Sequence, residues 1–460
     1  MLARRALPLV WLLGATACTG GTNLAIDAAP GSDSANVFDA GVDAPDAPLD
    51  APDPATRVEI TVLGQDGSGE PATGAIAVFR DPSDQVVHHG PVDANGMAFA
   101  YLPNGGSVTV MNAFNQPDDL SQRSHQITTV RGVKPGDRLR AGSPRVPSYQ
   151  FGAQTVMTGT FTSIPSMSQP FMQSSCATGY GSNNTTAALM FLASCVKPTF
   201  DLLSLYIGND LVWRYVWQPA LVYAAGGTFT IPNTWQPVPR NTTTILNVPP
   251  NLARVFSTLY MVLDGKPIEL ERGIVETPAA GTTTIPLMYI PGAGDSTVIT
   301  AGVHNGLGIP HTHVEVTKGS PATVMFDLSS QPLPSLGLSS ATQTSVSWAQ
   351  TGAGSADARL VGWVARWVDA NAVQNYANWQ IIEPADGTTS STLQSFPAAY
   401  SSDDPTIQSG LTMIGGIVQY VEYDNLDGYD AARPYGYPLF YVEGQFLDVE
   451  HRAHISRSHQ

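Results

Sequence analysis

Short segments of alternating polar and apolar residues, separated by turn residues, constrain the fold of this chain more than any other feature. The segment Val58 to Val62 alternates in this way, and a turn at Asp66 to Gly69 separates it from the next such segment at Ala75. The chain contains 43 Gly and 36 Pro among 460 residues, which interrupt helices and supply turns. A period of two is that of a half-buried strand. We therefore predict an all-β chain of tandem, Ig-like or prealbumin-like β-sandwich domains.

The first 17 residues have the features of an export signal. Arg4 and Arg5 precede an apolar run from Ala6 to Leu13, and small residues lead to Cys18. A charged start, a short apolar run and small residues before a cleavage point are typical of a secretory signal peptide. The apolar run is shorter than the roughly 20 residues that a membrane-spanning helix needs. We therefore predict an exported protein.

The residues around Cys18 resemble the lipobox of bacterial lipoproteins. The match is Ala15-Thr16-Ala17-Cys18, with Ala15 where that family prefers Leu. The resemblance implies cleavage before Cys18, lipidation of Cys18 and a membrane lipid as partner. Thr19 follows the cysteine in place of Asp, which under the enteric sorting rule implies the outer membrane of the bacterial cell envelope. The alternative is ordinary secretion with an unmodified cysteine.

The stretch after Cys18 is predicted to be a disordered acidic tether, residues 18–56. From Thr19 to Thr56 there are seven Asp, no Lys or Arg, and a loose Asp-Ala-Pro repeat. Such a composition buries too little apolar surface to fold. Its prolines and like charges favour extended conformations, so the tether would reach up to roughly 100 Å.

Cysteine parity supports this interpretation. The chain has three cysteines, Cys18, Cys176 and Cys195, and an odd number in an exported protein requires an explanation. Lipidation of Cys18 leaves Cys176 and Cys195 as a pair, which an oxidising compartment allows to form a disulfide. That bond would stabilise the fold by roughly 3 kcal/mol. Two buried free thiols are the alternative.

The charge balance argues against nucleic acid as a partner. The formal net charge is −16, and seven of the negative charges lie on the predicted tether. The remainder lacks the basic stripe that contacts with phosphates require.

Residues 57–147 form the clearest predicted domain. The segments EITVLGQDGSGEPATGAIAVFRD, VDANGMAFAYLPNGGSVTV and ITTVRGVKPGDRLR alternate strands with turns, and Asp93 to Gly96 forms a D-x-x-G turn. These segments resemble the carboxypeptidase-regulatory-like, prealbumin-type domains of bacterial surface proteins. The resemblance implies a β-sandwich that serves as a spacer or binding module, and it carries over no catalytic residue.

The remainder is divided by proline-rich breaks near residues 248–250 and 331–334. We predict a β-rich domain with the disulfide over 148–247, a β-sandwich over 248–330 and an aromatic-rich β domain over 331–460. Thr185 to Cys195 is predicted to be either a helix or a buried strand. The histidines at 451, 454 and 459 are predicted to lie in a frayed terminal tail.

Two clusters are candidate metal sites. His304 lies near His311, His313 and Glu315, and the last three would share one face of a strand, as a zinc site requires. The acidic turn with Asp424, Asp427 and Asp430 partly resembles a calcium-binding EF-hand loop, but Tyr423 occupies its first ligand position. An exposed polar strand and a solvated loop are the respective alternatives, so no cofactor is required.

Trp363 and Trp367 share one face of a predicted strand in the aromatic-rich domain. The leading interpretation is core packing, because Trp buries a large area. The alternative is a platform on which a carbohydrate ligand stacks.

No catalytic residue can be named. The chain has no G-x-S-x-G elbow, no HExxH motif and no glycine-rich phosphate loop. The leading functional hypothesis is a non-catalytic binding or structural module, anchored by lipid, with a glycan or a protein as ligand. The second is an anchored hydrolase of glycan or peptide, with its site in the aromatic-rich C-terminal domain.

Overall fold

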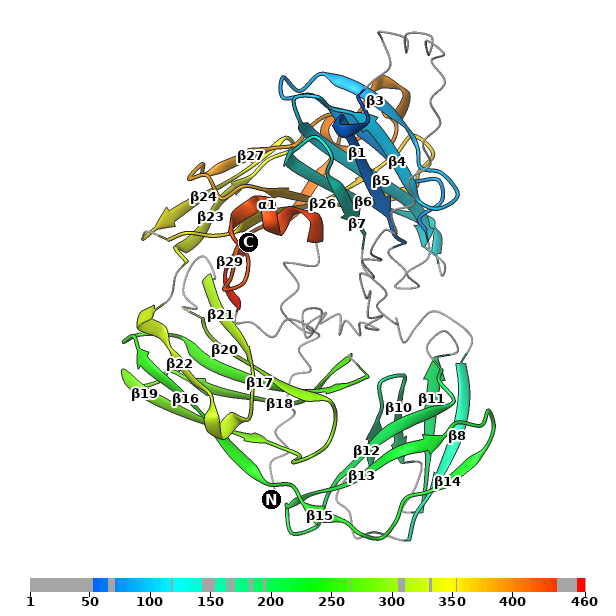
Figure 1. Ribbon diagram of the computed structural model, residues 1–460, viewed down its shortest axis with the longest axis vertical. Helices are drawn as coiled ribbons and strands as arrows, with labels where there is room; N and C mark the ends of the chain where they lie inside the picture. The colour runs from blue at the N-terminus through cyan, green and yellow to red at the C-terminus, as the bar shows by residue number, and fades with distance from the viewer. Residues whose placement is uncertain are drawn as a thin grey trace, which may run out of the picture.

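The protein is all-β, as predicted (Figure 1). The computed structural model describes residues 53–64, 71–116, 119–142, 154–162, 164, 170–181, 185–192, 196–264, 266–304, 311–330, 333–352, 354–436 and 453–459. Cys18 and nearly all of the predicted tether lie outside these residues. The strands that are described form five sheets.

A twelve-stranded sheet links distant parts of the chain. In spatial order its strands are β18 (Lys266–Glu276), β17 (Arg254–Leu263), β20 (Ser296–His304), β21 (His311–Lys318), β29 (Ala453–His459), β28 (Thr412–Tyr423), β25 (Ala358–Val368), β26 (Gln374–Glu383), β6 (Asp119–Val133), β5 (Gly106–Gln116), β2 (Ile76–Arg80) and β3 (Val86–Pro91). Neighbouring strands are antiparallel except β26 and β6, which run parallel. Strands from three of the predicted domains therefore share one hydrogen-bonded sheet.

Three short sheets pack on this large sheet. They are the N-terminal cover sheet, with β4 (Met97–Tyr101), β1 (Arg57–Val62) and β7 (Arg138–Ala141); the middle cover sheet, with β19 (Gly281–Met288), β16 (Arg240–Val248) and β22 (Met325–Asp327); and the C-terminal cover sheet, with β23 (Ser335–Ala341), β24 (Ser345–Thr351) and β27 (Ser390–Thr392). The middle cover sheet takes β16 from the end of the predicted 148–247 segment and pairs it with later strands.

The fifth sheet draws all its strands from residues 154–237. Its order is β14 (Thr228–Thr230), β8 (Gln154–Thr160), β11 (Thr186–Leu192), β10 (Ala177–Gly181), β9 (Phe171–Gln173), β12 (Thr199–Ile207), β13 (Trp213–Val222) and β15 (Gln236–Pro237). The segment predicted as either a helix or a buried strand is thus strand β11.

Helical structure among the described residues is short. It comprises α1 (Gly428–Ala432) and the 3-10 turns η1 (Pro54–Thr56), η3 (Pro321–Thr323), η4 (Leu328–Ser330), η5 (Ala398–Tyr400), η6 (Pro405–Ile407) and η7 (Arg433–Tyr435).

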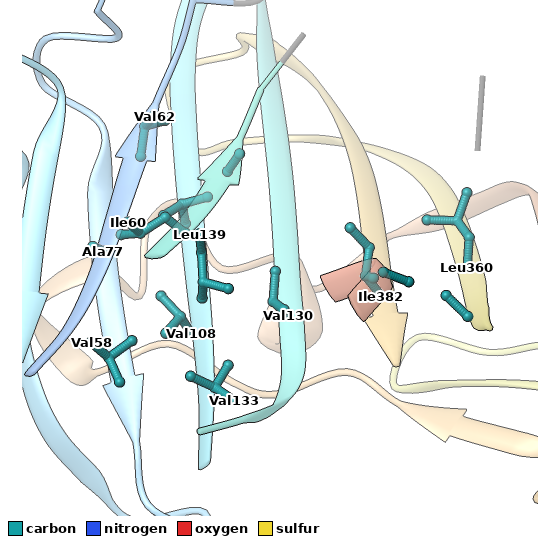
Figure 2. Close-up of a cluster of buried hydrophobic side chains, with 14 of the residues drawn as sticks. Val58, Ile60, Val62, Ala77, Val108, Val130, Val133, Leu139, Leu360 and Ile382 are labelled. Atoms are coloured by element: carbon teal, nitrogen blue, oxygen red, sulfur yellow. The ribbon is translucent and has the colours of Figure 1, made fainter. Parts of the chain in front are cut away.

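The large sheet has an apolar core on each face. On one face, Val58 and Ile60 of β1 pack with side chains of β5, β6, β25 and β26, and Figure 2 shows Leu360 and Ile382 in this cluster beside Val130. On the other face, the C-terminal cover sheet packs on a second cluster that includes all of Trp348, Trp363, Trp367 and Trp379. Each core therefore combines residues from both ends of the described chain.

The predicted D-x-x-G turn is present and shows why this position needs glycine. The Asp93 carboxylate accepts hydrogen bonds from the backbone N–H groups of Asn95 and Met97, each at 2.8 Å. Gly96 has φ of 72°, and a Cβ there would lie 2.5 Å from the carbonyl oxygen of Val62. The turn thus brings β4 against β1, with which it pairs.

Candidate functional site

A row of ionisable residues crosses three neighbouring strands in the middle of the large sheet. Glu315 of β21 is the register partner of His454 of β29, and His454 is in turn the partner of Glu422 of β28. Asp357, just before β25, continues the row, because its N–H donates to the carbonyl of Val421 at 2.8 Å. Neighbouring strands lie about 4.8 Å apart. We call these four residues the Glu–His–Glu row.

The residues on either side of His454 determine which face the row occupies. Ala453 and Ile455 belong to the apolar core that contains Val58 and Ile60. Since side chains alternate along a strand, position 454 belongs to the opposite face. This is the face on which the C-terminal cover sheet packs.

The edge of the C-terminal cover sheet lies next to the row. Ser456 donates to the carbonyl oxygen of Pro334 at 2.6 Å, and Ser458 accepts from the N–H of Leu338 at 3.1 Å. Both serines are fully buried, whereas His454 and Glu422 are half-buried. The row therefore lies just beyond the part of the large sheet that β23 covers.

The row has an excess of carboxylates. Burial, together with the nearby charge of Asp357, raises the pKa of Glu422 to about 7. Burial also raises the pKa of Asp357, although its carboxylate accepts backbone hydrogen bonds from Tyr423 at 2.7 Å and from Gly428 at 3.0 Å. Among the residues that the structure describes, no Lys or Arg forms an ion pair with either carboxylate.

In a second polar cluster on the same face, the positive and negative side chains pair with one another. Arg359 and Glu383 form an ion pair at 2.9 Å, and their side chains are only 2% and 4% exposed. Arg131 also pairs with Glu383, at 3.0 Å. Arg359 further donates to the backbone and side-chain oxygens of Thr388. Every charge here has a partner, so this cluster fastens the cover sheet to the large sheet.

A buried histidine forms a third polar group. His125 is 0% exposed, its Nε2 lies 2.9 Å from Oδ1 of Asn375, and its ring lies 5.0 Å from that of Trp367. Its Nδ1 lies 3.7 Å from a carboxylate oxygen of Asp403. Burial lowers the pKa of His125. These neighbours are an amide, an indole ring and a carboxylate, so the geometry is that of a packed core residue.

The alternative interpretation of Trp363 and Trp367, a carbohydrate platform, is wrong. Trp363 is 0% exposed and Trp367 is 2% exposed. Trp363 donates its indole N–H to the carbonyl of Thr342 at 2.7 Å, and its ring meets that of Trp379 edge to face. A ring enclosed on both faces has none left for a sugar, so the leading interpretation, core packing, is confirmed.

The structure does not assemble the predicted calcium site. Asp430 forms ion pairs with Lys134 and with Arg433, the latter at 2.7 Å. Asp427 precedes α1 without making a side-chain cap, and Asp424 lies in the turn before it. Within the described part of the chain, no three His, Cys, Asp or Glu side chains form a metal-binding group. The turn serves instead to hold α1 against the loop after β6.

The positions of the predicted histidine cluster lie on two different faces of the sheet. His311, His313 and Glu315 do lie on one strand, β21, although their side chains fall outside the described residues. His304 is the register partner of Thr312, so it occupies the opposite face from positions 311, 313 and 315. The prediction was wrong for His304.

Sequence reasoning missed His454 and Glu422. We predicted a frayed tail at His454, but Ala453 to His459 is an interior strand paired on both sides. The alternation of Ala453, His454, Ile455 and Ser456 was the signal that could have shown this.

Cys176 is buried, whereas Cys195 lies outside the described residues, so the disulfide stays a prediction.

Comparisons with known proteins do not place the chain in a family. No family model and no curated protein matches it. Solved structures give only remote likenesses. The Bacillus anthracis TIE protein is 12% identical over 59% of this chain and 49% of its own, with a TM-score of 0.15. An alpha-2-macroglobulin mutant of Salmonella is 10% identical over 76% of this chain and 27% of its own, with a TM-score of 0.13.

A third structure, the chicken CNTN1 FN1–FN3 domains, is 10% identical over 59% of this chain and 91% of its own, with a TM-score of 0.11. This chain thus spans about half of the Bacillus protein and about a quarter of the macroglobulin. Separately, the described residues include no helix with the length and hydropathy needed to cross a membrane.

Proposed function

We propose that this protein is a lipid-anchored component of the bacterial cell envelope that displays a β-sheet body as a non-catalytic binding or structural module. The proposal rests on the position at which the folded part of the chain, its body, begins. The acidic repeat ends at Thr56, and β1 starts at Arg57 as a strand whose alternate residues are buried. An export signal and a lipobox cysteine therefore precede a spacer that ends where folded structure starts.

The arrangement of the body supports a display role over catalysis. The clusters of charged residues at Arg359 and at Asp430 are closed ion-pair networks that hold elements together. In the aromatic-rich domain, where the hydrolase hypothesis places its site, Trp363 and Trp367 are buried in the core. We accordingly favour the binding or structural module, with a glycan or a protein as its ligand and the outer membrane as its location.

Lipidation is tested by metabolic labelling with a palmitate analogue in a bacterial host, followed by denaturing electrophoresis. We expect label on the parent chain, none on Cys18→Ser, and unchanged label on Cys176→Ser. Denaturing electrophoresis makes the result independent of folding. Label on Cys18→Ser, or membrane retention of that variant after a salt wash, would contradict the anchor.

We also propose a disulfide between Cys176 and Cys195. Cys176 directly precedes β10, and Ala177 of β10 pairs with Phe191 of β11. In the sequence, Cys195 follows the end of β11 by three residues, and this spacing supports the pair. Alkylation under denaturing conditions, with and without a reductant, tests the bond. Alkylation of both thiols in the unreduced Cys18→Ser chain would overturn it.

A further inference from the structure

We propose that the acidic segment of residues 19–52 docks on the outer face of the N-terminal cover sheet and so shortens the reach of the tether. The reach matters only for the anchored protein of the proposed function. The docking itself requires no lipid on Cys18, so the two proposals can fail separately. The docking face is an arginine–aromatic patch, which we define as the described residues Arg57, Phe99, Tyr101, Arg138 and Arg140.

Alternation along the three strands of the cover sheet places the patch on one face. β1 and β7 bury every second residue, and the residues between these point away from the core. The register aligns Phe99, Glu59 and Arg138 in one row across the sheet, and it places Arg57 beside Tyr101. The side chain of Arg138 is 86% exposed, and Phe99 is 46% exposed. The patch is therefore open to solvent.

The patch holds more positive than negative charge. Glu59 pairs with Arg57 at 2.9 Å and with Arg138 at 3.8 Å, so one carboxylate serves two guanidinium groups. Arg140 is exposed, and within the described part of the chain it forms no ion pair. The guanidinium of Arg57 also lies 4.1 Å from the centre of the Phe99 ring. A positive face on a chain of net charge −16 is complementary to an anionic partner.

The chain itself supplies such a partner beside the patch. Residues 19–52 contain six Asp and no Lys or Arg. This segment joins the described chain at Asp53, which caps the turn η1. The turn lies beside the loop that leads into β7, because a Cβ on Gly136 would lie 3.5 Å from the carbonyl oxygen of Ala55. The acidic segment therefore enters the structure next to the strand that carries Arg138 and Arg140.

The length of the chain allows the contact. Asp50 precedes Arg57 by seven residues, which cover about 22 Å at about 3.1 Å per residue. The face extends only about 13 Å from Arg57 to the row of Arg140. Each exposed ion pair is weak, but attachment to the same chain gives an effective concentration in the millimolar range. Salt should release the segment, because the Debye length falls from about 10 Å at 0.1 M to about 3 Å at 1 M.

Photo-crosslinking from position 99 tests which segment occupies the patch. The Cys18→Ser chain carries p-benzoylphenylalanine in place of Phe99 and is irradiated at low salt. We expect crosslinks within one chain to residues 19–52, and at least a fivefold loss of them in about 1 M NaCl. The double variant Arg138→Gln, Arg140→Gln should lose them as well. Both side chains are exposed, so this variant should fold as the parent does.

Two matched controls accompany the crosslinking. Arg240→Gln removes an arginine of β16 whose side chain is 46% exposed, and it should leave the crosslinks unchanged. The same probe in place of Tyr180, which is 59% exposed on the eight-stranded sheet, should not capture residues 19–52. Equal capture from position 180, or crosslinks from position 99 to a second copy of the chain instead, would overturn the proposal.

Small-angle X-ray scattering of the Cys18→Ser chain gives a second readout. Salt contracts a free acidic chain, because it screens the repulsion between like charges. Salt releases a docked segment instead, so the largest dimension of the chain should increase between low salt and about 1 M NaCl. The double variant Arg138→Gln, Arg140→Gln should contract. Contraction of the Cys18→Ser chain itself would contradict the docking, whatever the result of the lipidation experiment.

Discussion

The body contains two regions that are built in opposite ways (Figure 1). The eight-stranded sheet uses only residues 154–237 and has a core of its own around Met157 and Phe191. The N-terminal cover sheet, by contrast, lies over strands from both the first and the last part of the chain. The pair β6 and β26 joins residues about 250 positions apart. Proximity along the chain therefore defines the first region but not the second.

This difference affects how each region should unfold. A sheet of local strands loses few distant contacts when another part of the chain opens. The second region, the N-terminal cover sheet and the strands beneath it, combines strands from both ends of the chain, and we call it the interleaved region. It must close very long loops before its contacts form, which makes folding slow and cooperative. We expect damage to either core of the interleaved region to affect both ends of the chain together.

The largest effect is expected from Trp363→Ala. Removing this fully buried ring leaves a cavity in the core shared by β6, β25 and β26, so the free energy of unfolding should fall by about 3–5 kcal/mol. Chemical denaturation followed by circular dichroism measures it. The matched control is Tyr180→Ala, on the eight-stranded sheet with 59% of the residue exposed, which should change stability by about 0.5 kcal/mol or less. Equal losses in the two variants would contradict the comparison.

A second large effect is expected when the closed ion-pair cluster is broken. Glu383→Gln leaves the buried charge of Arg359 without its main partner and should reduce the free energy of unfolding by about 3 kcal/mol. Thermal unfolding can measure this loss. Replacing both Arg359 and Glu383 with apolar residues should restore most of the stability, because the remaining charge of the cluster, Arg131, is 25% exposed to solvent. An additive loss in the double variant would show that shape, rather than charge, governs this position.

A smaller, pH-dependent effect is expected from Glu422. Its pKa is raised from 4.5 to about 7, so the folded state holds a proton that the unfolded state releases. This contribution to stability is complete below pH 4.5 and is lost as the pH rises through 7. Its size should be about 1 kcal/mol or less, because the group is partly exposed to solvent. Glu422→Gln should flatten that part of the stability curve, and an unchanged curve would contradict the assignment.

The sequence predicted local structure well and long-range pairing poorly. Alternation identified β1 at Val58 to Val62, and the D-x-x-G rule identified the turn at Gly96. These features depend on neighbouring residues. The pairing of Glu315, His454 and Glu422 depends on which strands meet, and no local pattern contains that information. The position of His454 close to the last residue favours a tail, whereas it belongs to a strand paired on both sides.

The burial of the tryptophans illustrates the same limit. The pattern placed Trp363 and Trp367 on one face correctly, and burial shows that both lie in the same core. Whether that face is covered depends on β23 and β24, which return over it from an earlier part of the chain. Alternation identifies faces of a strand but does not identify what packs against them.

The central claim is that the two ends of the described chain form one cooperative unit. The most direct measurement is thermal unfolding of residues 53–142 expressed alone, followed by circular dichroism. We predict no cooperative transition, because β6 would lose its partner β26 and Ile127 would lose the C-terminal cover sheet from its face, although the N-terminal cover sheet still packs on Val130. A sharp, reversible transition of the isolated segment would contradict the claim and would show that it folds as an independent module.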